Sequence, residues 1–167
     1  MSYTLIATVT VGAGGAASID FTSIPQTYTD LMLVCSTRIT ASSFGGDTGI
    51  KINGTTTNYS GRMLVGDGSA TSSQTTTSSY RFGGFTEGST ATSNVFASTN
   101  FYIPNYTGST NKTISIDTVT ESAVNNGYQG IQATLWSNTA AITSLTLLDT
   151  GGTNFVQYST ASLYGIK

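Results

Sequence analysis

The chain has 167 residues but few charges, with 6 Lys and Arg, 8 Asp and Glu, and a net charge of -2. The length fits one domain, and the absence of any basic run argues against direct nucleic-acid binding. The apolar runs are shorter than the roughly 18 residues of a membrane-spanning helix, and no basic amphipathic stretch suggests binding to a membrane surface.

The first segments alternate between apolar and polar residues. Alternate positions from Tyr3 to Val11 are apolar, and a period of two is typical of a half-buried β-strand. The glycine-rich residues 12–15 predict a turn, because no helix follows them to form a phosphate-binding loop. A second strand is expected over Ala17–Phe21, before Pro25 breaks the pattern.

The rest of the chain repeats this pattern in short segments. Asp30–Arg38 is apolar at its centre, which predicts a strand in the middle of a sheet. Asn53-Gly54 is the strongest short signal for a β-hairpin, and residues 125–127 and 151–152 predict two further reversals. The other expected strands are Gly49–Asn53, Thr57–Leu64, Ser79–Phe82, Asn94–Ile103, Lys112–Glu121, Tyr128–Trp136, Ile142–Leu148 and Phe155–Tyr164.

This spacing predicts a single all-β domain over residues 1–167. About ten or eleven short strands without helical periodicity favour an antiparallel β-sandwich of jelly-roll-like form. Residues 66–79 stand apart, since they are nearly all Gly, Ser, Thr, Asp, Gln and Ala. We expect a flexible or arm-like loop there, either solvated or ordered against a neighbouring subunit.

No group of residues has the pattern of a catalytic or metal site, so we expect a protein that is not an enzyme and uses no cofactor or metal. Histidine is absent, which removes the usual proton-transfer and zinc-binding arrangements. Asp117 and Glu121 would lie about 13 Å apart along one strand, too far for a glycosidase pair. Asp47 and Asp67 lie in glycine-rich turns, where each offers calcium one oxygen of the roughly 6–8 that it needs.

The single cysteine, Cys35, lies in the most apolar segment. We expect a buried, inert thiol with a raised pKa and no disulfide. The first residues lack the basic and long apolar regions of a secretory signal, so we expect synthesis in a reducing cytoplasm.

The aromatic residues have two alternative roles. Packing in the core of a sandwich is the ordinary one, whereas rings left on the surface would stack on sugars or on another subunit. The candidates are Tyr80, Phe82, Phe85, Phe101, Tyr102, Tyr106 and Trp136.

The sheet edges have little protection. Six basic residues and two prolines are shared among all the expected strands, although soluble monomers usually guard free edges with Lys or Pro. We therefore expect the edges to be covered by copies of this chain or by another protein.

Four segments carry a family resemblance: Ile24–Leu31 (IPQTYTDL), Phe101–Tyr106 (FYIPNY), Leu135–Ile142 (LWSNTAAI) and Tyr158–Ile166 (YSTASLYGI). With the strand pattern between them, they resemble virion surface proteins of tailed phages, notably phages of cyanobacteria and other aquatic bacteria. The resemblance implies a β-sandwich or jelly-roll module, commonly trimeric, that serves as a capsid decoration (cement) protein, head fibre or tail-fibre part. It transfers no defined functional residues.

Among these roles we expect a decoration protein that stabilises the capsid as a homotrimer bound to the major capsid lattice. It would be made in the host cytoplasm and reside in the virion. The expected strands fill the chain and leave no room for a fibre shaft. The alternative is a receptor-binding head-fibre or tail-fibre module that recognises host-surface glycan, and an enzyme such as a glycan depolymerase is least favoured.

Overall fold

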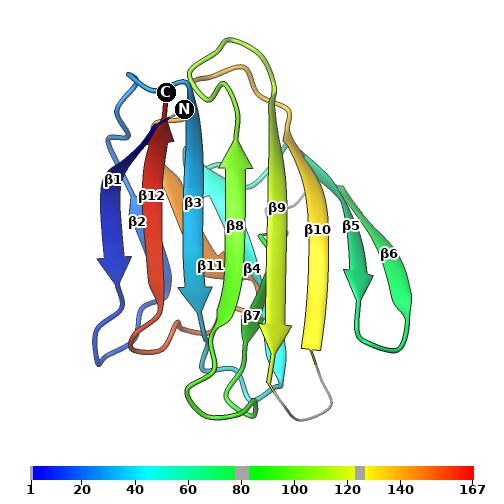
Figure 1. The fold of residues 1–167 in the computed structure, drawn as a ribbon. Helices are drawn as coiled ribbons and strands as arrows, with labels where there is room; N and C mark the ends of the chain where they lie inside the picture. Colours follow the sequence, from blue (N-terminus) through cyan, green and yellow to red (C-terminus); the bar gives the residue numbers. More distant parts are fainter. Residues whose placement is uncertain (1, 78–82, 123–126) are drawn as a thin grey trace.

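A computed structural model describes residues 2–77, 83–122 and 127–167. In these ranges twelve strands, all paired antiparallel, form two sheets that pack face to face (Figure 1). The expected all-β sandwich is therefore confirmed. From edge to edge, the larger sheet contains β1 (Tyr3–Thr10), β12 (Thr160–Ile166), β3 (Asp30–Thr37), β8 (Ala97–Ile103), β9 (Lys112–Glu121), β10 (Gly127–Trp136), β5 (Tyr59–Gly66) and β6 (Thr71–Thr77). The smaller sheet contains β2 (Ser18–Phe21), β11 (Leu145–Asp149), β4 (Gly45–Ile52) and β7 (Phe85–Glu87).

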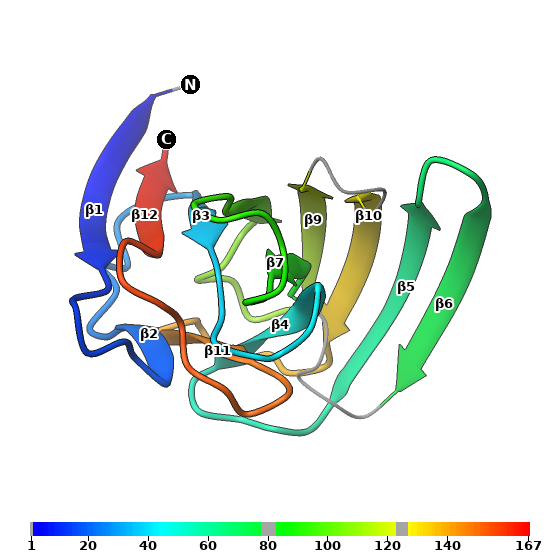
Figure 2. The ribbon, with the colours of Figure 1, turned by 90° about the horizontal axis from the view of Figure 1, so that it is seen from below.

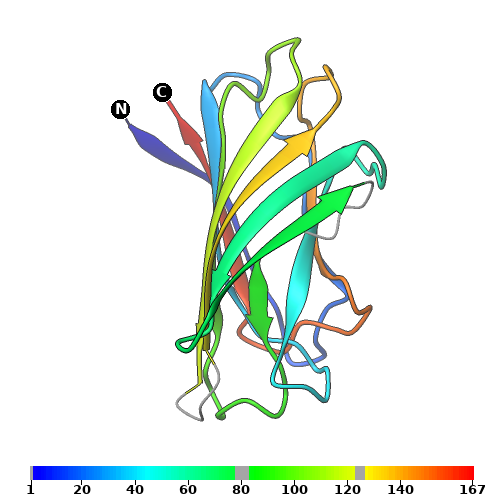
Figure 3. The same cartoon turned by 90° about the vertical axis from the view of Figure 1, so that its right-hand side faces the viewer.

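The strand pairing follows a nested order. β1 pairs with β12, β2 with β11, β3 with β8, and β4 with β7. The remaining strands are two hairpins, β5–β6 and β9–β10, which extend the larger sheet beyond β8. Because the smaller sheet has no matching extension, β5 and β6 overhang it (Figure 2). Figure 3 shows that the twist of the larger sheet carries this hairpin round toward the side of the smaller sheet.

The apolar core lies between the smaller sheet and the central strands of the larger one. Inward residues of β3, β8 and β12, such as Leu33, Phe101 and Leu163, are fully buried. Each buried side chain of this size contributes about 1.5–3 kcal/mol. Cys35 is buried among them as a free thiol, as expected, and burial raises its pKa.

Asn53 and Gly54 form a tight turn but not the expected hairpin. Both residues have positive φ, 50° and 70°. However, this turn leads from β4 in the smaller sheet to β5 in the larger one, so the flanking strands do not pair. The Asn53 side chain instead accepts the N–H of Thr143 at 2.8 Å and of Ser144 at 3.1 Å, and donates to the carbonyl of Ala141 at 2.8 Å. The hairpin prediction is wrong because a turn signal fixes the local backbone, not the sheet in which the next strand pairs.

The loop expected over residues 66–79 is wrong for residues 71–77, which form edge strand β6. Gly66 ends β5, and residues 78–79 lie outside the described ranges. Asp67 closes the connecting turn by accepting the N–H groups of Ser69 and Ala70. The sequence of β6 has no alternation of apolar and polar residues, so it gives no strand signal. An edge strand can form without that alternation because it is not buried between two neighbours, and threonine favours extended backbone.

Other expectations agree with the structure. The expected Lys112–Glu121 strand is β9, and Gly12 and Gly15 form a turn closed by a 3.0 Å backbone hydrogen bond. The expected strand at Ser79–Phe82 and most of the reversal at 125–127 lie outside the described ranges, although β9 and β10 do pair as neighbours. None of the described segments forms a helix that is long and apolar enough to cross a membrane.

Candidate functional site

The carboxylates singled out in the sequence do not converge into a metal-binding cluster. Within the described ranges, no three Cys, Asp or Glu side chains are placed to share a metal ion. Asp117 lies on β9 opposite Asn100 and Ile131 of the neighbouring strands, and Glu121 ends the same strand. Asp47 lies in strand β4 and not in the expected turn, because Gly45, Gly46 and Asp47 pair with β7, whereas Asp67 does lie in a turn. Both residues line one cleft.

The surface of the larger sheet that points away from the smaller sheet is here called the outer face. Its centre exposes four large apolar side chains, Val34, Leu64, Val119 and Ile131. Ile131 and Leu64 are direct neighbours on β10 and β5, and they are 56% and 51% exposed. Val119 lies diagonally beside Ile131, since it pairs with Gln129, whereas Asn100 and Asp117 separate Val34 from Ile131. A soluble surface usually scatters such residues singly, so the cluster of Leu64, Ile131 and Val119 is unusual.

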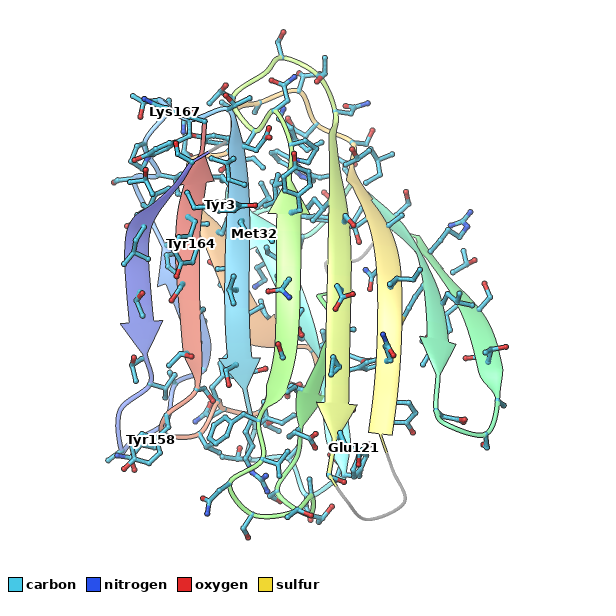
Figure 4. The ribbon with its side chains drawn as sticks, viewed as in Figure 1. Tyr3, Met32, Glu121, Tyr158, Tyr164 and Lys167 are labelled. Atoms are coloured by element: carbon cyan, nitrogen blue, oxygen red, sulfur yellow. The ribbon has the colours of Figure 1, made fainter. Side chains whose placement is uncertain are left out.

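A second apolar group lies on the outer face near the ends of the chain. Leu5, Tyr164, Met32 and Tyr102 are successive partners across β1, β12, β3 and β8. Tyr3 and Leu5 are 56% and 54% exposed, and Figure 4 shows Tyr3, Met32 and Tyr164 together on this face. Tyrosine and methionine are enriched in protein interfaces because they bury large areas adaptably.

Charged side chains are sparse on the outer face, where the described strands contribute Asp30, Arg62, Asp117 and Glu121. Asp30 is already engaged by the Tyr102 hydroxyl at 2.8 Å and by the N–H of Asn105 at 2.7 Å. The hydrogen bond to Asp30 raises the pKa of Tyr102. Asp117 lies beside Ile131 and Arg62 lies two residues from Leu64, so a partner that covers the centre of the face must also accommodate these two charges.

The overhang of β5 and β6 creates the second feature, here called the cleft. It lies between the inner side of this hairpin and the β4–β7 edge of the smaller sheet, and its volume is about 480 Å³. Val65, Ser72 and Gln74 line one wall, while Gly46 and Phe85 line the other. A second hollow of about 760 Å³ shares Asp67, Thr120 and Tyr128 with the cleft and continues it along the sheet end.

Three aromatic rings form a row in the cleft. The ring centres of Phe44 and Tyr128 are 6.0 Å apart, and those of Tyr128 and Phe85 are 5.3 Å apart. All three residues are partly exposed. Phe85 was a candidate from the sequence, but Phe44 and Tyr128 were missed because only the fold brings them to it.

Two threonine hydroxyls fix the position of Phe85. Its N–H donates to Thr118 Oγ1 at 2.8 Å, and its carbonyl accepts Thr99 Oγ1 at 3.3 Å. The two hydroxyls also bond each other at 2.8 Å. Gly84 has φ +94°, and a Cβ there would lie 2.8 Å from atoms of both threonines. The backbone can therefore approach this pair only at a glycine.

The remaining aromatic candidates divide between core and surface. Phe101, Tyr106 and Trp136 are fully buried, so core packing is confirmed for them. The Trp136 ring N–H donates to Thr55 Oγ1 at 3.0 Å. Tyr102 lies on the outer face, and Tyr80 and Phe82 lie outside the described ranges.

A buried carboxylate lies at the end of β7. Glu87 is 0% exposed, and among the described residues neither carboxylate oxygen has a partner at hydrogen-bonding geometry, although the backbone of Glu121 is near enough to lower the pKa of Glu87. Burial raises the pKa of Glu87, and the nearby Arg38 charge offsets this only in part. The Arg38 guanidinium donates to the carbonyls of Ser89, Ala91, Thr92 and Val95, and so holds the connection between β7 and β8.

Comparisons with known protein families, with characterised proteins and with solved structures find no match for this chain. The outer face and the cleft are the two features from which a function can be argued.

Proposed function

We propose that this chain is a structural protein without catalytic activity, which decorates and stabilises a tailed-phage capsid by binding the major capsid lattice through its outer face. The supporting observation is the cluster of exposed apolar side chains Leu64, Ile131 and Val119 on a sheet face whose described strands carry four charged side chains. Apolar and aromatic residues with few charges are the composition of the centre of a protein interface.

The dimensions of the outer face suit this role. Eight strands spaced by about 4.8 Å span about 34 Å, and seven residues extend about 24 Å along a strand. The product is about 800 Å², which is close to what one partner contributes to a standard stable interface. Repeated over a shell, such contacts would oppose outward pressure from packed DNA.

The nested strand order supports the same proposal. Without the two hairpins, the sheets have the orders β1-β12-β3-β8 and β2-β11-β4-β7. One long hairpin folded over itself gives this order, and we infer a jelly roll with two inserted hairpins. Jelly rolls occur in viral capsid domains and in lectins, so the fold is compatible with the resemblance but does not decide the function.

We also propose that the chain is a homotrimer. Among the described strands, β6 forms one edge of the larger sheet, and its seven residues include no charge or proline. Such edges pair readily with another chain. Size-exclusion chromatography with light scattering on the purified chain is expected to give three times the monomer mass. A monomer at micromolar concentration would contradict this part of the proposal.

The main test is the copy number and position of the chain in purified particles that contain it. We expect an abundance comparable to that of the major capsid protein by quantitative mass spectrometry, and density on the shell in images of whole particles. A few copies near the tail would overturn the decoration role.

A binding experiment then tests the outer face. Particles from which the chain has been removed are incubated with the purified chain, with Ile131→Glu/Leu64→Glu, and with Thr22→Glu/Gln157→Glu. The last variant adds the same charge at exposed residues outside the outer face. We expect the outer-face variant to bind at least tenfold more weakly, and equal binding of both variants would contradict an outer-face contact.

A further inference from the structure

We propose that the cleft binds an uncharged saccharide, which stacks on the Tyr128–Phe85 rings and forms hydrogen bonds with side chains of β5–β6 and β4. The cleft lies on the opposite side of the larger sheet from the outer face, and only its continuation reaches outer-face residues, among them Val119 and Glu121. A saccharide on the rings of the cleft leaves Leu64 and Ile131 uncovered, so the proposal does not depend on the decoration role.

The row of rings supplies the apolar part of the site. Tyr128 lies next to both Phe44 and Phe85, and all three rings are partly exposed. Pyranose rings have apolar C–H faces, which pack on aromatic rings much as other apolar groups do. Rings that belonged only to the core would be covered completely, as Phe101 and Trp136 are.

The polar lining matches the hydroxyls of a sugar. Ser43, Ser72 and Gln74 offer hydroxyl and amide groups, while Asp47 and Asp67 contribute carboxylates. Oriented polar groups beside an apolar surface are the ordinary composition of a small-molecule site. Hydroxyl and amide groups both donate and accept hydrogen bonds, as sugar hydroxyls do.

Charge selects an uncharged ligand over an anionic one. None of the described residues that line the cleft or its continuation is Lys or Arg. The carboxylate of Asp67 is held in its ionised form by hydrogen bonds from the N–H groups of Ala70 and Ser69, which lower its pKa. The described lining therefore disfavours a phosphate, sialic acid or uronic acid.

The shape favours a short oligosaccharide. The volume of about 480 Å³ is within the roughly 300–1,000 Å³ of ligand sites, and the adjoining hollow continues past Tyr128. A quaternary ammonium ion is instead held by a compact cage of rings around one point, whereas these rings form a row.

The site is also held in place before any ligand arrives. Thr99 and Thr118 fix the backbone of Phe85, and the ring lies over Gly130, where an added Cβ would be 3.1 Å from it. A preorganised surface avoids the cost of ordering side chains on binding.

The test is a glycan array with the full purified chain, followed by calorimetry with any uncharged oligosaccharide that binds. Sialylated and uronic-acid glycans and free choline serve as charged comparators. We expect uncharged glycans to bind, and Tyr128→Ala to weaken them about tenfold. Tyr128→Phe should retain most of the affinity because it keeps the ring, and Gln74→Ala, at the exposed edge strand, should also weaken binding.

The control is Tyr158→Ala, which removes an exposed ring far from the cleft and should not change the affinity. Thermal unfolding of each variant verifies that it is folded. An array without uncharged glycans, binding of choline alone, or an affinity unchanged in both Tyr128→Ala and Gln74→Ala would overturn the proposal. The particle-binding assay separates the two proposals, since Tyr128→Ala should still bind particles while Ile131→Glu/Leu64→Glu should still bind glycan.

Discussion

The two halves of the larger sheet differ in what lies beneath them. Under β12, β3 and β8 the smaller sheet closes the core, and inward side chains such as Leu33 and Phe101 are apolar and fully buried. Toward β10, β5 and β6 the inward positions also include Gln132 and Thr134, and the cleft opens beneath the hairpin. The same two-residue alternation therefore builds a core where a second layer is present and a ligand-sized hollow where that layer ends.

The largest expected difference between the halves is in the free energy of unfolding that is lost when an inward side chain is truncated to alanine. Phe101→Ala leaves a cavity in the closed half and should cost about 3–5 kcal/mol of unfolding free energy. Val65→Ala, at the cleft, should cost about 1 kcal/mol, because its void joins a hollow that is already open to water. Urea denaturation followed by circular dichroism measures both values, and equal losses would mean that the two halves are packed alike.

A smaller effect is expected at the boundary of the halves. Thr118→Val keeps the side-chain shape but leaves the Phe85 N–H without its acceptor, so we expect a loss of about 1–3 kcal/mol. Thr113→Val, on the exposed side of the same strand, is the matched control and should change stability by less than about 0.5 kcal/mol. Similar urea-unfolding midpoints for Thr118→Val and Thr113→Val would show that the Thr99 and Thr118 hydroxyls do not hold β7 in place.

The buried carboxylate at the end of β7 should make stability depend on pH. The pKa of Glu87 is raised from its ordinary value of 4.5, so the folded chain binds this proton more tightly than the unfolded chain. The protonated Glu87 side chain therefore contributes its full stability at low pH, and this contribution is lost as the pH rises from 4.5 through the pKa of the folded state.

Glu87→Gln should remove that fall and make the chain more stable than the parent protein at neutral pH. Urea midpoints between about pH 4 and pH 7 test this expectation. A pH profile with the same slope as the parent would mean that Arg38 already neutralises the carboxylate.

The smallest expected effect is at a strained turn in the closed half. Tyr158 has φ 73° and is 68% exposed, and such a conformation disfavours a bulky residue by about 1–2 kcal/mol. Tyr158→Asn should stabilise the chain by up to about 1 kcal/mol, since asparagine tolerates this region better. Destabilisation, seen as a lower unfolding midpoint, would instead assign the ring a packing role.

The sequence predicts the elements better than their partners. Alternation identified Lys112–Glu121 as a strand, and Asn53-Gly54 identified a turn, because both signals are local. The sheet that each strand joins depends on contacts between distant segments, so the Asn53-Gly54 hairpin and the 66–79 loop were misjudged. Cys35 was placed correctly in the core, since apolar surroundings along the chain indicate burial, whereas Trp136 was left between core and surface until the fold showed it buried.

The candidate site was less accessible to sequence reasoning. Phe44, Phe85 and Tyr128 come from three segments that meet only after the hairpins extend the larger sheet. The outer face could not be predicted for another reason. An apolar residue such as Ile131 or Leu64 shows the same alternation in the sequence whether it is exposed or buried. Period two says that the sides of a strand differ, but not which side meets solvent.

The place of β12 between β1 and β3 also bears on how the protein is made. β12 is the last strand in chain order, yet it fills a position between two of the earliest strands. While a ribosome still holds that segment, β1 and β3 have no strand between them, and a C-terminal strand from another nascent copy fits the same place. Strand exchange thus competes with closure during synthesis, so slower translation should favour exchange and dilution should favour the self-contained form.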